Sequence, residues 1–177
     1  MDLVVRDSLL VFNGRLLILG SQMTDILDGM IAISRAAGDA ILKVYEEDDF
    51  GIETKADDSP LTRADLAAHN IIVGKLEELA PEIPVLSEES EGIGYEQRKQ
   101  WSRYFLVDPL DGTKEFINRN GEFTVNIALI DNGVPVMGVV FVPVKDVLYA
   151  GSQQPERVAF IEQNGERRAI GTRKLEA

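Results

Sequence analysis

The hydrophobic pattern of the chain changes near residue 84 from helical spacing to short, strand-like runs. From Asp25 to Glu47, apolar residues recur along one helix face, which predicts a long helix with Thr24 as its N-cap. This stripe consists of Leu27, Met30, Ile31, Ala37, Ile41, Leu42 and Tyr45. A second helix is predicted from Thr62 to a stop at Pro81. Its apolar face consists of Ala64, Ala68, Ile71, Leu76 and Leu79.

The second half of the chain has the pattern of strands joined by tight turns. The strand-like runs are residues 85–87, 104–107, 123–131, 134–142, 147–151 and 157–163. Turn signals separate them at Asp131-Asn132-Gly133, Pro143 and Asn164-Gly165, so consecutive antiparallel strands are expected. Helices followed by a meander of strands predict an α+β layered fold, with two N-terminal helices packed on a mainly antiparallel sheet.

Two segments outside the helices lack this regular spacing. Residues 1–22 contain two apolar runs around Asn13-Gly14, which predict an N-terminal extension folded as a hairpin, with a poorly ordered leader as the alternative. Residues 48–61 are polar and contain Gly and Pro, so we expect a loop with a short extended piece near Ile52.

Composition narrows the chemistry that the chain can perform. Its 177 residues are 45% hydrophobic and 27% charged, as in globular domains. Eighteen basic and thirty acidic residues give a net charge of −12, which argues against a nucleic-acid polymer as partner. There is no cysteine and only one histidine, so zinc-thiolate and histidine-rich sites are excluded. That histidine, His69, is expected to be a surface or helix-packing residue. Carboxylates and hydroxyls remain, and these suit hard cations such as Mg²⁺.

Acidic residues follow two of the predicted strands. Asp108 and Asp111 come after an apolar strand, and Glu88 and Glu89 come after another. If the two strand ends converge, their carboxylates require cations, and an oxygen-only set favours Mg²⁺ or Mn²⁺ over zinc. The alternatives are ordinary turn chemistry at Asp108 and Asp111 and a solvated turn at Glu88 and Glu89.

Asp65 stands three residues after Thr62 at the start of the second predicted helix. This spacing is that of a capping box, in which the two side chains cap the helix and do no more. The alternative is a functional one, in which the Asp65 carboxylate orients a water molecule or a neighbouring hydroxyl.

Together these segments resemble the inositol monophosphatase superfamily of metal-dependent, lithium-sensitive phosphatases. The resemblance rests on DPLDGT at 108–113, on Glu88-Glu89 and on the loop KADDSPLTRAD. Within the superfamily, LSEES, YFLVDPLDGTKEFI and NGEFTVNIALI are similar to bacterial 3'(2'),5'-bisphosphate nucleotidases of the CysQ group. Lys114-Glu115-Phe116 marks that group, since inositol monophosphatases tend to have Thr-Asn-Phe there.

The resemblance implies a role for each matching residue. The implied metal ligands are Glu88, Asp108, Asp111 and the main-chain carbonyl of Leu110. The implied catalytic residues are Asp65, Glu88 and Thr113, with Asp65 hydrogen-bonded to the Thr113 hydroxyl to orient and deprotonate the attacking water. The implied substrate contacts are Glu88, Leu110, Asp111, Gly112 and Thr113, the last two through backbone N–H groups.

One motif of the superfamily is not found in this chain. The superfamily supplies a further metal-binding aspartate from a later Trp-Asp motif in a second lobe, whereas Trp101 of this chain is followed by Ser102. We therefore expect residues 23–177 to form the metal-binding first lobe, with the second lobe absent and activity impaired. The uncovered lobe interface is expected to favour a homo-oligomer.

The resemblance implies a phosphomonoesterase that uses two or more Mg²⁺ ions, with Mn²⁺ as a substitute. It would hydrolyse the 3'-phosphate of adenosine 3',5'-bisphosphate, a small-molecule by-product of sulfate assimilation, to AMP and phosphate. An inositol or sugar monophosphatase and an inactive cation-binding remnant are the alternatives. No apolar run is long enough to span a bilayer, so we expect a cytoplasmic protein, with a peripheral place at the inner face of the membrane as the alternative.

Overall fold

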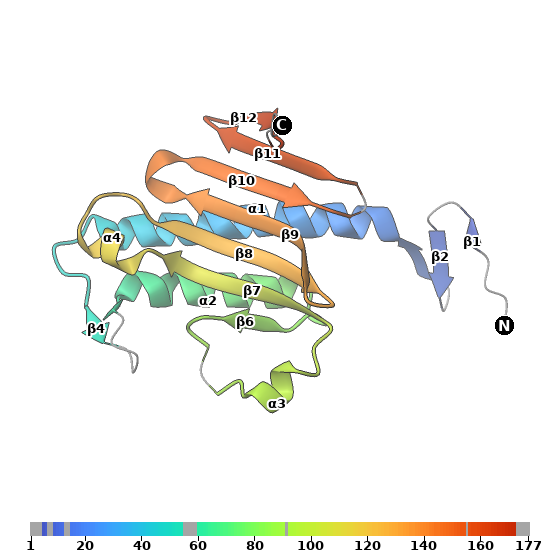
Figure 1. The fold of residues 1–177 in the computed structure, drawn as a ribbon, viewed down its shortest axis with the longest axis horizontal. Helices are drawn as coiled ribbons and strands as arrows, with labels where there is room; N and C mark the ends of the chain where they lie inside the picture. The colour runs from blue at the N-terminus through green and yellow to red at the C-terminus, as the bar shows by residue number, and fades with distance from the viewer. Residues whose placement is uncertain are drawn as a thin grey trace, which may run out of the picture.

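The computed structural model describes residues 5–6, 9–12, 15–54, 60–90, 92–154 and 156–172, with side chains from residue 25 onward. Figure 1 shows long helices lying against one face of a sheet. The predicted α+β layered fold, with helices packed on a mainly antiparallel sheet, is confirmed. Among the described residues, no helix is long and apolar enough to cross a membrane.

Short strands precede the first long helix. β1 (Val5–Arg6), β2 (Leu9–Phe12) and β3 (Arg15–Ile18) pair antiparallel in the order β1-β2-β3. β2 and β3 are the two runs expected to form a hairpin. The turn expected at Asn13-Gly14 lies outside the described residues.

The first helix is longer than the sequence pattern predicts. α1 (Leu19–Tyr45) begins directly after β3, so the start predicted at Asp25 and the N-cap predicted at Thr24 are wrong. Leu19 and Met23 continue the apolar spacing toward the N-terminus and no proline interrupts it, so the threonine is accommodated inside the helix.

The second helix begins where the sequence predicts. α2 (Arg63–Leu79) has Thr62 as N-cap, and both hydrogen bonds of a capping box are present. The Thr62 side chain accepts from the Asp65 N–H, and the Thr62 N–H donates to the Asp65 carboxylate at 2.7 Å. The Ala64 N–H also donates to the Thr62 hydroxyl, at 3.2 Å. Ile72, not Ile71, lies on the buried face. Ile72 continues the four-residue step that places buried side chains at Ala64, Ala68 and Leu76.

The segment between these helices contains two short strands. β4 (Glu53–Thr54) and β5 (Pro60–Leu61) pair antiparallel, with Glu53 opposite Leu61. β4 lies next to the extended piece expected near Ile52. Residues 55–59 of the motif KADDSPLTRAD lie outside the described residues.

The main sheet has the order β12-β11-β10-β9-β8-β7-β6 within the described residues. Its strands are β6 (Val85–Ser87), β7 (Arg103–Asp111), β8 (Thr124–Asp131), β9 (Val134–Val142), β10 (Val147–Ser152), β11 (Val158–Gln163) and β12 (Glu166–Ala169). Neighbours pair antiparallel except β6 and β7, which are parallel. The expectation of consecutive antiparallel strands is therefore wrong for this pair. Residues 88–102, which include the short helix α3 (Tyr95–Arg98), carry the chain back as a crossover.

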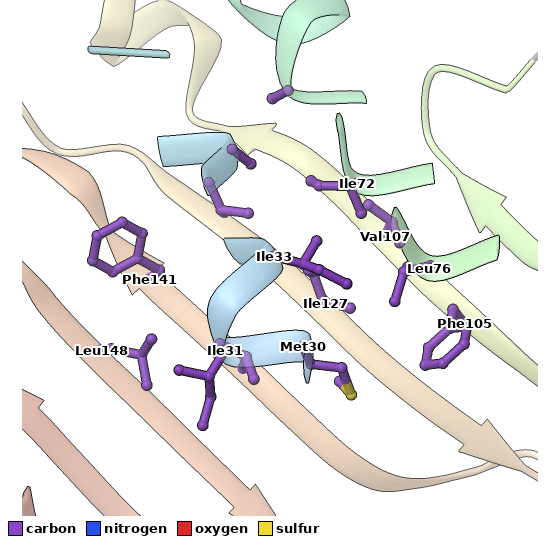
Figure 2. Close-up of a cluster of buried hydrophobic side chains, with 14 of the residues drawn as sticks. Met30, Ile31, Ile33, Ile72, Leu76, Phe105, Val107, Ile127, Phe141 and Leu148 are labelled. Atoms are coloured by element: carbon purple, nitrogen blue, oxygen red, sulfur yellow. The ribbon is translucent and has the colours of Figure 1, made fainter. Parts of the chain in front are cut away.

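The core lies between the helices and the sheet. Figure 2 shows α1 side chains such as Met30 and Ile33 meeting α2 and strand side chains such as Leu76 and Ile127. Because side chains alternate along a strand, the inward positions of β7, β8 and β9 are buried here while the next positions face away from the helices.

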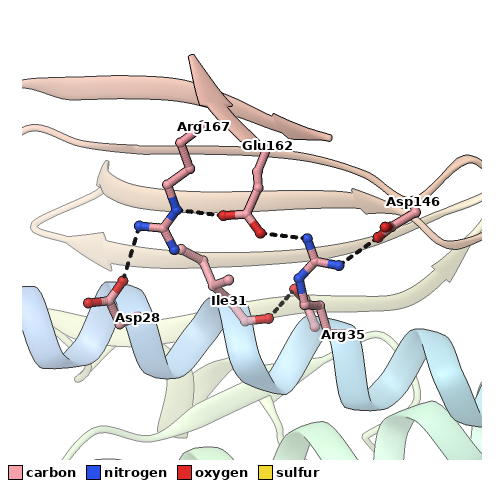
Figure 3. Close-up of polar contacts among 7 residues, drawn as sticks. Asp28, Ile31, Arg35, Asp146, Glu162 and Arg167 are labelled. Atoms are coloured by element: carbon pink, nitrogen blue, oxygen red, sulfur yellow. Dashed lines mark hydrogen bonds and ion pairs between the residues drawn. The ribbon is translucent and has the colours of Figure 1, made fainter. Parts of the chain in front are cut away.

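A chain of ion pairs attaches the outer strands to α1 (Figure 3). Arg35 contacts Asp146 at 2.6 Å and Glu162 of β11 at 2.8 Å. Glu162 also accepts a hydrogen bond from Arg167 of β12, and this bond and that from Arg35 hold the pKa of Glu162 below its usual value. Arg167 in turn lies 3.7 Å from Asp28 of α1. Charge pairing thus replaces apolar packing at β12, whose side chains are exposed.

Candidate functional site

The C-terminal end of β7 carries two acids in an irregular stretch of strand. β7 pairs regularly with β8 up to Asp108, and the register of this pairing shifts between Asp108 and Asp111. Pro109 lies in this interval and has no N–H to donate to the ladder, which favours an irregularity there. The strand continues through both acids, and the short helix α4 (Thr113–Ile117) follows at once.

Asp108 lies on the sheet face that points away from the helices. The ladder places Asp108 opposite Asn126 of β8, Asn126 opposite Val140 of β9, and Val140 opposite Tyr149 of β10. Directly opposed residues point to the same face, so these side chains form one row across the sheet. Asn126 donates from Nδ2 to Asp111 Oδ2 at 3.1 Å, which connects the second acid to the row.

Glu88 reaches the same place from the end of β6. The Glu88 N–H donates to the carbonyl of Val107 at 2.9 Å, and the Ser90 N–H donates to the carbonyl of Ser87 at 3.0 Å. Glu88 and Asp108 line the same cavity, and the charge of Glu88 acts on Asp108. Glu89 lies in the turn between Ser87 and Ser90. The structure therefore brings together acids from the ends of two strands.

Asp108 is an unfavourable place for a negative charge. Burial, followed by the charges of Glu88 and Asp111, raises the pKa of Asp108 to about 7. Its Oδ1 atom is buried and has no hydrogen-bond partner among the described residues. A buried oxygen without a donor is costly, and a cation would satisfy it.

These acids are close but are not arranged around one point. Within the part of the chain that the structure describes, no group of three or more His, Cys, Asp or Glu side chains is positioned to hold a metal ion as it stands. Carboxylates approach closely only when a proton or a cation lies between them. Accordingly, the nearby charge of Glu88 contributes to raising the pKa of Asp108.

Asp65 is buried at the start of α2 and connects this helix to α4. Its Oδ2 accepts hydrogen bonds from the N–H and the hydroxyl of Thr62 at 2.7 and 2.6 Å, and its Oδ1 accepts one from the Thr113 hydroxyl at 3.2 Å. Burial raises the pKa of Asp65, although the bonds from Thr62 and Thr113 oppose the shift. Asp65 therefore caps the helix and also contacts Thr113, which the capping alternative does not require.

Gly112 allows the chain to turn from β7 into α4. Its φ is +96°, a conformation that favours glycine, and a Cβ atom there would lie 3.1 Å from the carbonyl oxygen of Glu122. The Thr113 hydroxyl lies 3.3 Å from the carbonyl oxygen of Leu110. The backbone from Leu110 to Thr113 is thus held in a tight turn beside the acids.

A cavity of about 620 Å³ opens beside Glu88 and Asp108 on the outer sheet face. Its walls include Leu106 and Val140 from the sheet and Arg98 from α3. The site is therefore bordered by apolar surface on one side and by carboxylates on the other.

Comparison with known proteins places this geometry in a family. The model described as "Inositol monophosphatase family" matches residues 22–166. The chain belongs to the inositol monophosphatase family. Among solved structures, CysQ from Bacteroides thetaiotaomicron is similar with a TM-score of 0.68 and 47% identity, over 82% of this chain and 51% of that one. The extragenic suppressor protein suhB from Bartonella henselae has a TM-score of 0.68 at 29% identity, over 84% of this chain and 55% of that one.

Curated relatives from this family carry a more specific name. The 3'(2'),5'-bisphosphate nucleotidase CysQ of Shigella flexneri is 54% identical over 149 residues, which are 84% of this chain and 59% of the relative. CysQ of Escherichia coli K12 is 52% identical over the same shares of each chain. The chain thus spans about three fifths of the length of these relatives.

Two polar residues at this candidate site were not among those predicted from the sequence. Asn126 bonds to Asp111, and His69 of α2 lies 2.9 Å from the Ser87 hydroxyl through its Nδ1 atom. Asn126 could have been found as a polar residue inside the otherwise apolar run TVNIALI. His69 offers no such signal, because its partner is distant in sequence.

Proposed function

We propose that this chain carries the cation-binding lobe of a Mg²⁺-dependent phosphomonoesterase. The proposed reaction is hydrolysis of the 3'-phosphate of adenosine 3',5'-bisphosphate to AMP and phosphate. The observation that carries the proposal is the meeting of Glu88 and Asp108 beside Asp111, with a buried Asp108 oxygen that has no hydrogen-bond partner in the described part of the chain. The names of the CysQ relatives support the substrate.

The residues present fit a hard cation. Carboxylate and carbonyl oxygens are the ligands that Mg²⁺ and Mn²⁺ prefer, and no thiolate or imidazole stands among them. Glu88, Asp108, Asp111 and the carbonyl of Leu110 would hold two or more ions, and Asn126 keeps the Asp111 carboxylate oriented. Bound cations would lower the pKa of coordinated water, neutralise the phosphate and stabilise the leaving alkoxide.

Asp65 and Thr113 act on the proton of the attacking water in this proposal. The Thr113 hydroxyl donates to Asp65, so its oxygen is free to accept a hydrogen bond from a water molecule beside Glu88. Burial raises the pKa of Asp65, which makes that carboxylate a better proton acceptor. The backbone N–H groups of Gly112 and Thr113 contact the phosphate, as in other turns that lead into a helix.

We expect turnover by this chain alone to be lower than that of the CysQ relatives, because it spans only 59% of their length. Phosphate release from adenosine 3',5'-bisphosphate and from inositol 1-phosphate, each with millimolar Mg²⁺ and with EDTA, tests the proposal. The expected result is weak hydrolysis of the nucleotide that disappears in EDTA. Equal turnover in EDTA would contradict the metal mechanism, and preference for inositol phosphate would favour the other family activity. No turnover with retained Mg²⁺ binding would identify a cation-binding remnant.

The cytoplasmic location stays a prediction, and no finding supports peripheral attachment to a membrane.

A homo-oligomer formed through the outer sheet face is a further part of the proposal, and because Leu106 and Val140 also line the cavity beside Asp108, this dimer would cover the site and be the inactive form. Leu106, Val140 and Tyr149 are 44%, 40% and 42% exposed on this face, a high exposure for apolar side chains on central strands. Sedimentation equilibrium is expected to detect dimers of the wild type and monomers of Leu106→Lys. Leu66→Lys is the matched control, because Leu66 is 42% exposed on α2. A monomeric wild type, or equal dissociation of both variants, would contradict this interface.

A further inference from the structure

His69 holds the strand end that carries Glu88. His69 lies one helical turn after Asp65, so the two side chains project from the same side of α2. Asp65 contacts Thr113, which follows β7, and His69 contacts Ser87, the last residue of β6. One helix therefore makes side-chain hydrogen bonds to both segments that bear the acids.

Ser87 is placed to transmit this contact to Glu88. Ser87 is 3% exposed and stands opposite Val107 in the parallel ladder, on the sheet face toward the helices. Glu88 follows Ser87 in the turn and lines the same outer-face cavity as Asp108. The His69 bond thus restrains the rotation of the strand end from the side opposite the acids.

The Ser87 backbone restricts the same turn. The Ser87 N–H donates to the Ser90 hydroxyl at 3.3 Å, and its carbonyl accepts the Ser90 N–H at 3.0 Å. His69 is half-buried, and either neutral tautomer permits its bond, since the Ser87 hydroxyl can donate or accept.

We propose that His69 is a positioning residue for the cation site, which acts by fixing Ser87 so that the Glu88 carboxylate faces Asp108. The inference rests on the proposed function, because it takes Glu88 as a metal ligand. A purely structural His69 would instead contribute one neutral hydrogen bond to folding stability, with no effect on cation affinity.

The test measures Mn²⁺ affinity of the intact chain by electron paramagnetic resonance of the free ion, with Mg²⁺ as competitor. His69→Ala and Ser87→Ala are each expected to weaken binding about 10-fold, the lower end of what loss of a group that orients a metal ligand costs. The double variant is expected to lose no more than either single one, because both remove the same contact. His69→Asn is expected to restore most of the affinity, since its amide can occupy the place of Nδ1. Asn70→Ala, at an exposed neighbouring position of α2, is the matched control.

Unfolding in urea with EDTA, measured for every variant, separates affinity from stability. A lower midpoint for His69→Ala with unchanged Mn²⁺ affinity would overturn the inference and leave the proposed function standing. Failure of His69→Asn to restore binding would also overturn it. If the wild type binds neither cation, the proposed function fails, and this inference fails with it.

Discussion

Replacing Asp108 with Asn is expected to stabilise the metal-free protein and to abolish its affinity for Mg²⁺. The pKa of Asp108 is raised to about 7, first by burial and then by Glu88 and Asp111, so the charged form is disfavoured in the folded state. Between about pH 4 and pH 7 the folded protein retains a proton that the unfolded chain has released. Wild-type stability in EDTA therefore falls as the pH rises through this window and stays low above it.

The Asp108→Asn side chain is neutral at every pH, so this variant lacks the pH dependence of stability that Asp108 causes. Above pH 7 we expect the variant to be more stable than the wild type by about 1–2 kcal/mol, a modest figure because solvent screens a half-buried group. Near pH 4 the free energies of unfolding of the wild type and the variant should differ little. Urea unfolding in EDTA at pH 4.5, 6 and 8 measures the difference, and Asp39→Asn, at an exposed position on α1, controls for loss of charge alone.

In saturating Mg²⁺ the wild type should be more stable than the Asp108→Asn variant, the reverse of their order in EDTA. Binding to the folded state stabilises the wild type, whereas the variant is expected to lose more than about 100-fold in affinity, since even groups that only orient a ligand cost 10–100-fold. A variant that is destabilised in EDTA at pH 8 would show that Asp108 is not a strained acid. A variant that keeps its Mg²⁺ affinity would remove Asp108 from the proposed ligands.

The features that the sequence predicted correctly depend on residues close together in the chain. The capping box at Thr62 and Asp65 forms within one helical turn. The turns at Asn132-Gly133 and Asn164-Gly165 have positive φ at all four residues, as expected for Asn-Gly between antiparallel strands. Local backbone preference decides each of these structures, so the residue types alone are informative.

Apart from the helix start predicted at Thr24 and the choice of Ile71 over Ile72, the features that were missed depend on contacts between distant residues. The parallel pairing of β6 with β7 follows from a crossover, whose direction the apolar pattern of three residues does not reveal. Asn126 and His69 gain their partners only when strand register and helix docking are known. The matching motifs predicted which acids are of interest, whereas the raised pKa of Asp108 follows from burial and neighbours that only the folded chain provides.

Replacing Phe116 with Ala is expected to produce a large loss of stability and to loosen the proposed cation site. Phe116 is fully buried, and its ring centroid lies 4.8 Å from that of Phe50, 5.1 Å from Tyr45 and 5.3 Å from Phe123. Arg119 covers the cluster, 4.6 Å above the Phe50 ring, and donates to the carbonyl of Tyr45 at 2.7 Å. Removing such a ring costs about 3–5 kcal/mol, because a cavity remains where the neighbours cannot collapse.

The functional effect follows from the length of α4. This helix has five residues, and Phe116 is its buried residue, so little else holds Thr113 against Asp65 or fixes the backbone after Asp111. We expect Phe116→Ala to weaken Mn²⁺ binding under conditions where the protein is still folded, as shown by circular dichroism and urea unfolding. Leu148→Ala is the matched control, because Leu148 is fully buried on β10, and its loss should lower stability by about 2–5 kcal/mol without weakening the site. An equal loss of Mn²⁺ affinity in both variants would mean that general instability, and not the attachment of α4, sets the affinity of the site.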